Sequence, residues 1–123
     1  MKFFNYSEFD SPDKLGSGKN MSPEILEMLD LAREKYDKPI KITSGYRTKA
    51  YNEGLKKRGY KASPNSSHLK GLAVDIAYKG SRERYIILNA LISVGINRIG
   101  IGNSFIHCDL DNSKSQDVIW LYK

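Results

Sequence analysis

The sequence predicts one α+β domain with a small, largely antiparallel sheet that helices cover on one side and leave open on the other. The chain has 123 residues, of which 40% are hydrophobic and 28% charged, the size and composition of a single globular domain. Apolar residues recur at helical spacing or with period two, in the order helix, strand, helix, strand, helix, strand, strand. We therefore expect one domain over residues 1–123, with residues 1–21 as an N-terminal aromatic anchor and loop.

The first half of the chain contains two expected helices and one strand. A Ser-Pro-Glu segment at residues 22–24 is typical of a helix start, and the apolar residues that follow it predict a helix over about residues 22–36. Residues 39–43 alternate with period two and predict a half-buried strand. Residues 48–58 predict a polar helix, and the glycine, proline and serines of residues 59–67 predict a loop.

The second half contains the strand patterns on which a functional site could be built. In residues 71–77 the alternation places large apolar side chains on one face and Asp75, flanked at i±2 by alanines, on the other. Residues 81–94 predict a third helix that ends at a glycine. Residues 98–101 and 105–110 predict two short strands, with a Gly-Asn turn between them.

The later of these two strands also has two faces. His107 and Asp109 share one face, whereas Cys108 lies on the other, which predicts a core position for the thiol. Residues 119–122 alternate apolar and aromatic side chains and predict a last strand or a packed tail. A substrate-stacking role for Trp120 has no support in the sequence alone.

Cysteine and histidine are scarce, and their counts exclude several classes of protein. With Cys108 as the single cysteine, no intramolecular disulfide, thiolate-rich zinc finger or iron–sulfur cluster can form. His68 and His107 are the only histidines, so any imidazole chemistry must use one or both. The N-terminus lacks the apolar stretch of a secretory signal, and no apolar run is long enough to span a bilayer. We expect a soluble monomer that is cytoplasmic at synthesis and does not insert into membranes.

The net charge of +6 is concentrated in the middle of the chain. Residues 41–84 carry 11 basic and 3 acidic side chains. Residues 1–40 carry 6 basic and 8 acidic side chains, and residues 85–123 carry 3 of each kind. This segment, in a chain with 8 tyrosines, raises a nucleic-acid-binding domain as one hypothesis. No nucleic-acid motif accompanies the charge, so we expect no nucleic-acid partner and attribute the charge to attraction toward another anionic polymer.

His68, Asp75 and His107 form a candidate zinc site. Zinc takes imidazole nitrogens and carboxylate oxygens, and a catalytic site combines three protein ligands with one water. If the strands that carry Asp75 and His107 are paired, both side chains can point to the same side of the sheet, and His68 reaches them from the preceding loop. On the pattern alone, the histidines could instead be satisfied structural residues and Asp75 an exposed strand residue.

Three segments of the chain together resemble one enzyme family. Residues 66–75, Ser-Ser-His-Leu-Lys-Gly-Leu-Ala-Val-Asp, are similar to the Ser-x-His-x-x-Gly-x-Ala-x-Asp motif of the zinc D-alanyl-D-alanine carboxypeptidases and endopeptidases of peptidoglycan, whose superfamily includes the hedgehog domain. Residues 43–47 resemble the family's Ser-Gly-Tyr-Arg segment, and residues 105–109 the closing His-x-Asp of its short bacterial and bacteriophage branch. The segments follow the family order over about residues 39–120, so the resemblance implies the hedgehog/D-Ala-D-Ala peptidase-like fold.

The resemblance also implies roles for individual residues. His68, Asp75 and His107 would bind Zn²⁺, and Arg47 and Ser66 would hold the peptide substrate, Arg47 by pairing with a carboxylate or carbonyl group. A guanidinium forks onto a carboxylate and stays charged, which suits such an anchor. Two alternatives remain open, with Arg47 as a solvated cation and Ser66 as a loop residue that hydrogen-bonds its own backbone.

The catalytic base is where the chain departs from the family. Many members carry an acidic residue three positions before the last zinc histidine, and in this chain that position is Ser104. Asp109 is the nearest carboxylate to His107 in sequence and shares its face of the strand, so we expect Asp109 to be the base. Its alternative role is to orient His107.

The leading hypothesis is a zinc metallopeptidase that hydrolyses peptidoglycan stem peptides, either as a carboxypeptidase that removes a terminal D-alanine or as an endopeptidase. A bacteriophage lytic enzyme, or endolysin, released for cell wall degradation would give a chain without a signal access to its substrate. One alternative keeps the fold and the zinc but binds the cell wall without catalysis, as Ser104 suggests. A basic nucleic-acid-binding domain is the remaining alternative.

Overall fold

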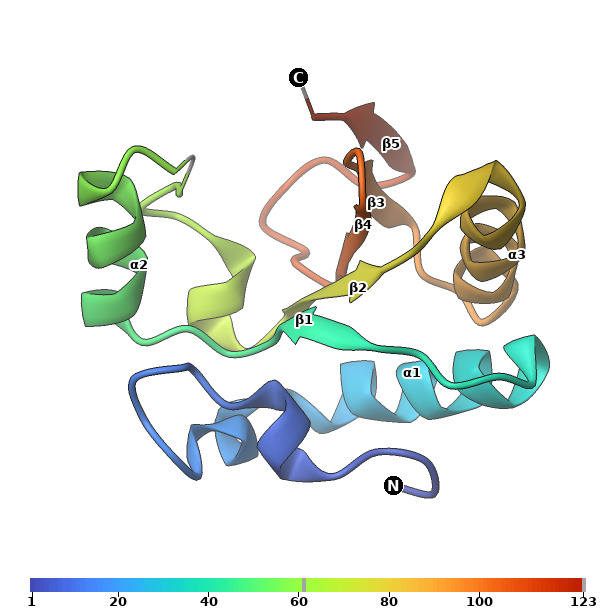
Figure 1. Cartoon of the computed structure of the whole chain (residues 1–123), viewed down its shortest axis with the longest axis horizontal. Helices are drawn as coiled ribbons and strands as arrows, with labels where there is room; N and C mark the ends of the chain where they lie inside the picture. Colours follow the sequence, from blue (N-terminus) through green and yellow to red (C-terminus); the bar gives the residue numbers. More distant parts are fainter. Residues whose placement is uncertain (61, 123) are drawn as a thin grey trace.

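The computed structural model describes residues 1–60 and 62–122, which form three α-helices, three short 3-10 helices and one sheet (Figure 1). The helices and strands are α1 (Pro23–Tyr36), β1 (Ile42–Ser44), α2 (Lys49–Lys57), β2 (Ala73–Ala77), α3 (Gly80–Ser93), β3 (Arg98–Ile101), β4 (Phe105–Asp109) and β5 (Val118–Leu121). The 3-10 helices are η1 (Tyr6–Phe9), η2 (Ser17–Asn20) and η3 (Ser67–Lys70).

The strands form a sheet in the order β1-β2-β4-β3-β5. The pairs β1 with β2, β2 with β4 and β4 with β3 are antiparallel, which confirms the predicted fold class. The edge strand β5 runs parallel to β3, because the segment after β4 crosses to the far side of β3 before the chain turns back (Figure 1). This crossover brings residues near the C-terminus alongside β3.

The core lies between one face of the sheet and the helices α1 and α3, which pack against each other. Proline at the first position of α1 and apolar residues at helical spacing give this helix one face to bury, as predicted. Side chains of the two helices meet the inward-facing side chains of β2 and β4, whose alternation follows the predicted faces. The fully buried members of this core include Ile25, Leu29, Leu91, Val74, Ile76, Ile106 and Cys108.

The helix α2 is not part of this layer. Only Asn52 is buried in α2, so no apolar side chain of this helix joins the core. Tyr51 and Leu55 of α2 instead line a cleft on the open face of the sheet. The predicted loop at residues 59–67 follows α2 and leads into η3, and its Lys61 lies outside the described residues.

Several element boundaries differ from the sequence prediction by one to three residues. The strand expected at residues 39–43 is shorter and later, and its pairing with β2 contains a register shift between Ile42 and Ser44. The helix expected to start at Ser81 starts one residue earlier, at Gly80, whose φ of 77° only glycine adopts freely.

The N-terminal segment is held against the end of β1 by Phe9, whose side chain is fully buried. The carbonyl oxygen of Phe9 accepts a hydrogen bond from the Tyr46 amide at 2.8 Å. A Cβ atom on Gly45 would lie 2.7 Å from the Cα of Phe9, so this close approach requires glycine. The contact fixes the backbone immediately before Arg47.

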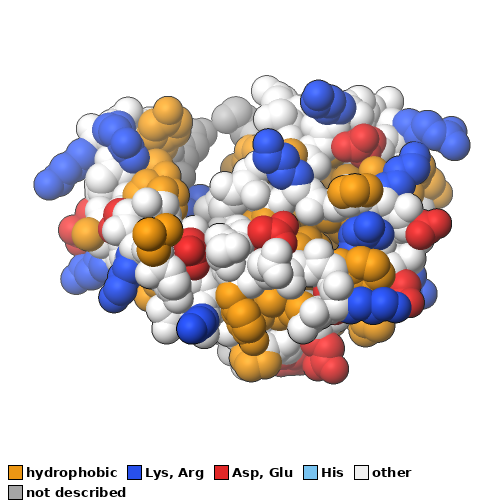
Figure 2. Space-filling view, turned by 60° about the horizontal axis from the view of Figure 1, so that its bottom comes forward, with side chains coloured by type: hydrophobic (Ala, Val, Ile, Leu, Met, Phe, Trp, Pro, Cys, Tyr) orange, Lys and Arg blue, Asp and Glu red, His pale blue; other side chains and the backbone are white. Residues whose placement is uncertain are grey.

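The surface gives no support to a nucleic-acid footprint on the face that carries α1. Among the described residues on that face, Lys and Arg side chains are interspersed with Asp and Glu side chains (Figure 2). A nucleic-acid-binding surface gathers its basic side chains into a patch or stripe. Among the described residues, no helix is both long and apolar enough to cross a membrane.

Candidate active site

An open cleft of about 1180 Å³ lies over β2 and β4 on the face of the sheet opposite the core. One side of the cleft is formed by α2 and the loop after it, and the other by β5 and the segment that leads to it. The side chains at the floor and walls include Arg47, Tyr51, Ser66, His68, Asp75, Ser104, Phe105, His107, Asp109, Lys114, Trp120 and Tyr122.

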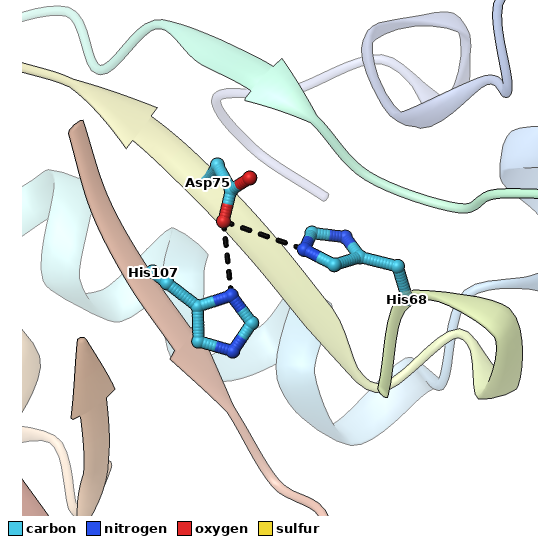
Figure 3. Close-up of side chains that lie close together, drawn as sticks. All are labelled: His68, Asp75 and His107. Carbon is cyan, nitrogen blue, oxygen red and sulfur yellow. Dashed lines mark hydrogen bonds and ion pairs between the residues drawn. The ribbon is translucent and has the colours of Figure 1, made fainter. Parts of the chain in front are cut away.

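His68, Asp75 and His107 converge at the floor of this cleft (Figure 3). Asp75 of β2 and His107 of β4 are direct cross-strand partners, as the sequence pattern required. The Nδ1 atom of His107 lies 2.9 Å from Asp75 Oδ1, and the Nε2 atom of His68 lies 3.3 Å from the same oxygen. One nitrogen or oxygen atom from each residue lies within 4.8 Å of the others, so a single ion could contact all three.

The turn that delivers His68 is built by its neighbours in sequence. The Oγ atom of Ser66 accepts a hydrogen bond from the His68 amide at 3.2 Å, which caps the start of η3. Gly71 ends η3 with a φ of 69°, and a Cβ atom there would lie 2.2 Å from the carbonyl oxygen of Asn20. The Ser-x-His-x-x-Gly spacing therefore encodes a short turn that aims one imidazole at the cleft floor.

The outward ring nitrogen of each histidine is hydrogen-bonded, which orients the inward one. The Nδ1 atom of His68 lies 2.8 Å from the Gly45 carbonyl oxygen, which can only accept, so His68 carries its proton there and turns Nε2 inward. The Nε2 atom of His107 lies 2.7 Å from Asp109 Oδ2, which turns Nδ1 toward Asp75. Two inward nitrogens and one carboxylate oxygen are a donor set that zinc accepts, and three protein ligands leave a position for water.

The charges at the floor are strongly coupled. Burial raises the pKa of Asp75, but hydrogen bonds from His107 and His68 outweigh it and hold this pKa well below its usual range. Burial lowers the pKa of His68, and contact with Asp75 offsets only part of the shift. Burial also acts to lower the pKa of His107, yet hydrogen bonds to Asp109 and Asp75 reverse the direction and raise it. Asp75 is therefore ionised, as a metal ligand must be.

Asp109, expected as the catalytic base, lies behind the ring of His107 with its side chain only 1% exposed. Its Oδ2 faces His107, and its Oδ1 accepts hydrogen bonds from Arg98 Nε at 2.7 Å and from the Asp111 amide at 3.0 Å. Burial raises the pKa of Asp109, but the hydrogen bonds to His107 and Arg98 outweigh it and lower the pKa. These contacts correspond to the alternative role, that of orienting His107.

The two residues expected to hold substrate both line the cleft. The Nη2 atom of Arg47 lies 3.5 Å from Asp75 Oδ2, and Arg47 Nε donates to Ser44 Oγ at 3.1 Å. The guanidinium is thus a partly buried cation at the edge of the candidate metal-ligand cluster and not a solvated surface group. The hydroxyl of Ser66 is engaged with the His68 amide, so Ser66 does hydrogen-bond its own backbone while it faces the cleft.

The sequence pattern did not identify a buried network next to these residues. Arg98 is 7% exposed, pairs with Asp109 and stacks over Trp120 with its Cζ 5.0 Å from the ring centroid. The alternation of β3, in which Arg98 and Gly100 face away from the buried Ile99 and the partly buried Ile101, is the signal that could have placed Arg98 on the cleft face.

A second network ties η3 to the segment after β4. Asp111 is 1% exposed and accepts hydrogen bonds from Ser67 Oγ at 2.7 Å and from Lys70 Nζ at 3.1 Å. Burial raises the pKa of Asp111, but hydrogen bonds from Ser113, Ser67 and Lys70 outweigh it and hold the pKa well below its usual range. The turn that carries His68 is thereby joined to the strand that carries the other imidazole.

Three candidate metal ligands meet in a solvent-accessible cleft, an arrangement typical of metal-dependent hydrolases. A family model described as Peptidase M15 matches residues 4–109. The chain therefore belongs to the peptidase M15 family, which confirms the resemblance carried by the three motif segments.

Comparison of structures points to the same fold. The crystal structure of the L-Ala D-Glu endopeptidase ChiX of Serratia marcescens superposes with a TM-score of 0.61 at 20% sequence identity, over 75% of this chain and 81% of that one. No curated protein matches the chain in sequence.

Proposed function

We propose that this protein is a zinc-dependent peptidase that hydrolyses peptide bonds of peptidoglycan stem peptides, as a carboxypeptidase or an endopeptidase. The observation that carries the proposal is the convergence of His68, Asp75 and His107 at the floor of an open cleft, in a chain of the peptidase M15 family. The endopeptidase activity named for the Serratia structure supports a cell-wall peptide as substrate.

The residues at the cleft floor fit zinc by their chemistry. His68 Nε2, His107 Nδ1 and an Asp75 oxygen would hold the ion, and their outward hydrogen bonds already fix the two rings. When bound, zinc lowers the pKa of its water to near 7 and polarises a carbonyl group. The protein contributes a donor set that hydrogen bonds orient and an open cleft of about 1180 Å³ above it.

Arg47 is proposed to anchor the substrate. Its guanidinium lies beside Asp75 at the cleft floor, where a carboxylate or carbonyl of the peptide can accept hydrogen bonds from it. Because arginine stays charged at all relevant pH values, the anchor does not depend on protonation. Ser66 faces the same cleft and is proposed to act mainly through the turn that presents His68.

Asp109 is proposed to position His107. Both of its oxygens are occupied by His107, Arg98 and a backbone amide, which supports this role over that of a base. Asp109→Asn tests it, because loss of a positioning carboxylate lowers metal affinity about 10- to 100-fold. Loss of a general base instead lowers kcat about 100-fold or more at saturating zinc. The second result, with zinc affinity intact, would return Asp109 to catalysis.

One observation favours a second candidate function, a zinc-containing module that binds the cell wall without hydrolysis. Among the described residues that line the cleft, Asp75 and Asp109 are the only carboxylates, and Ser104 occupies the position where many relatives carry an acid. The two functions are separated by incubating zinc-loaded protein with purified peptidoglycan and analysing the soluble fragments by mass. New peptide termini are the result expected of the peptidase. Retention on the wall with no new termini is the result expected of the binding module.

A further inference from the structure

Three aromatic side chains form a continuous surface beside His107, which we call the aromatic shelf: Phe105, Trp120 and Tyr122. The ring centroids of Phe105 and Tyr122 are 5.1 Å apart, and those of Trp120 and Tyr122 are 6.2 Å apart. The centroid of the Trp120 ring lies 5.6 Å from the centroid of the His107 ring. All three side chains line the cleft, and Tyr122 is 38% exposed, so the shelf faces the space a substrate enters.

The backbone under the shelf leaves room for these rings. A Cβ atom on Gly100 of β3 would lie 2.5 Å from Trp120 Nε1 and 2.6 Å from a ring carbon of Tyr122. A Cβ atom on Gly102 would lie 2.2 Å from a ring carbon of Phe105. Any other residue at these two positions would push the rings off the sheet, so the two glycines are what allow the rings to lie across it.

The shelf depends on residues outside the part of the chain that defines the family. The family model matches residues 4–109, whereas Trp120 and Tyr122 come from β5 and the residue after it. The parallel pairing of β5 with β3 brings them beside the metal-ligand cluster. The family match therefore does not cover Trp120 and Tyr122.

The position of the shelf in the sheet indicates which part of a substrate it meets. Arg47 follows β1, the candidate metal ligands lie on β2 and β4, and the shelf lies toward β3 and β5. A peptide that crosses the floor has Arg47 on one side of its scissile bond and the shelf on the other. Because an extended chain spans about 3.3–3.6 Å per residue, a shelf that begins 5.6 Å from the His107 ring is about two residues away.

We propose that the aromatic shelf is a subsite for a sugar ring on the amino side of the scissile bond. The inference rests on the proposed function in its endopeptidase form, because only a bond near the amino end of the stem peptide lies about two residues from the glycan. Arg47 then holds a carboxylate-bearing part of the peptide on the other side of that bond. The amino end of a stem peptide, which is joined to the glycan, then points toward the shelf. A pyranose ring has one face of C–H groups and a rim of hydroxyls, which suits exposed aromatic faces with a phenol and an indole as polar groups at the edge.

The test compares two substrates with zinc-loaded protein. One is a muropeptide that consists of a disaccharide and its stem pentapeptide, which holds every bond that the proposed function could cut, and the other is the same pentapeptide with an acetylated amino end, so that the sugar is the main difference. Tyr122→Ala removes the exposed ring of the shelf. Leu121→Ser alters the preceding residue of β5, which is 72% exposed and does not line the cleft, and serves as the matched control.

We expect wild-type protein to have a higher kcat/KM for the muropeptide than for the sugar-free peptide. Tyr122→Ala should reduce the ratio of kcat/KM for the muropeptide to kcat/KM for the sugar-free peptide about tenfold, a typical effect of losing one stacking ring. Leu121→Ser should keep the wild-type ratio. All three proteins should bind the same amount of zinc. A wild-type ratio near one, or a Tyr122→Ala effect that is equal on both substrates, would overturn the sugar subsite and indicate that the shelf binds peptide. Failure of wild-type protein to cleave either substrate would instead refute the proposed function.

Discussion

Replacement of Arg98 by methionine should destabilise the protein strongly, because it would leave the Oδ1 atom of the buried Asp109 carboxylate without its guanidinium partner. The side chains of Arg98 and Asp109 are 9% and 1% exposed, and their atoms meet at 2.7 Å. Breaking a buried pair by removal of one partner costs about 3–5 kcal/mol. Since domains of this size have a free energy of unfolding of about 5–15 kcal/mol, the loss would be a large fraction of the total.

The assay is urea denaturation of metal-free wild type, Arg98→Met, Asp109→Asn and the double variant. We expect the double variant to lose at least about 1 kcal/mol less than the sum of the single losses, because the second substitution removes the uncompensated charge. Arg82→Met, at an exposed position of α3, is the matched control and should change the free energy of unfolding by less than about 0.5 kcal/mol.

The reasoning fails if Arg98→Met costs less than about 1 kcal/mol, or if the two single losses add without coupling. Either result would mean that water or another side chain replaces Arg98 at Asp109. A second readout follows from the contact of Asp109 with His107: Arg98→Met should also weaken zinc binding, whereas Arg82→Met should not.

Three further outcomes follow from the fold. Leu29→Ala in the core should lower the free energy of unfolding, measured by urea denaturation, by about 2–5 kcal/mol. Leu31→Ala, at a 49% exposed position of the same helix, should lower it by less than about 0.5 kcal/mol. Equal losses would contradict the assignment of the core face of α1. Gly71→Ala should lower both the free energy of unfolding and the zinc affinity, because its Cβ would meet a backbone oxygen at 2.2 Å. In the control Gly16→Ala, the Cβ meets no described atom within 4 Å, so the substitution should cost only the strain of about 1–2 kcal/mol for positive φ. Unchanged zinc binding in Gly71→Ala would show that the His68 turn tolerates the change. The pKa of Asp111 lies below its unfolded value of about 3.9, so its contribution to stability is present above that pH and is lost as the pH falls further. Asp111→Asn should therefore flatten the fall in melting temperature below about pH 4, and a melting curve as pH-dependent as that of the wild type would refute this assignment.

The candidate ligands could be placed from the sequence because strand alternation and pairing determine them together. Period-two patterns assigned Asp75 and His107 to one face, and antiparallel pairing of their strands makes them cross-strand neighbours. The Ser-x-His-x-x-Gly turn brings His68 to these two side chains, and it ends at Gly71, which has a positive φ.

The rest of the site depends on contacts between segments far apart in the sequence. Arg98 reaches Asp109 only through the register of β3 against β4, which no local pattern specifies. The aromatic shelf depends on the parallel pairing of β5 with β3, and a last strand read from alternation alone has no defined neighbour or direction. We propose a positioning role for Asp109 in place of the expected catalytic one for the same reason, since its place beside His107 in sequence does not show that both of its oxygens have other partners.

The most direct test of zinc-dependent peptide hydrolysis is the release of amino groups from purified peptidoglycan as zinc is removed by a chelator and then restored in steps. We expect activity to disappear with the metal and to return to a plateau at about one zinc per chain, while folded His68→Ala shows no return over the same range. Full activity of folded, metal-free wild-type protein would contradict the assignment of His68, Asp75 and His107 as the ligands of a catalytic zinc.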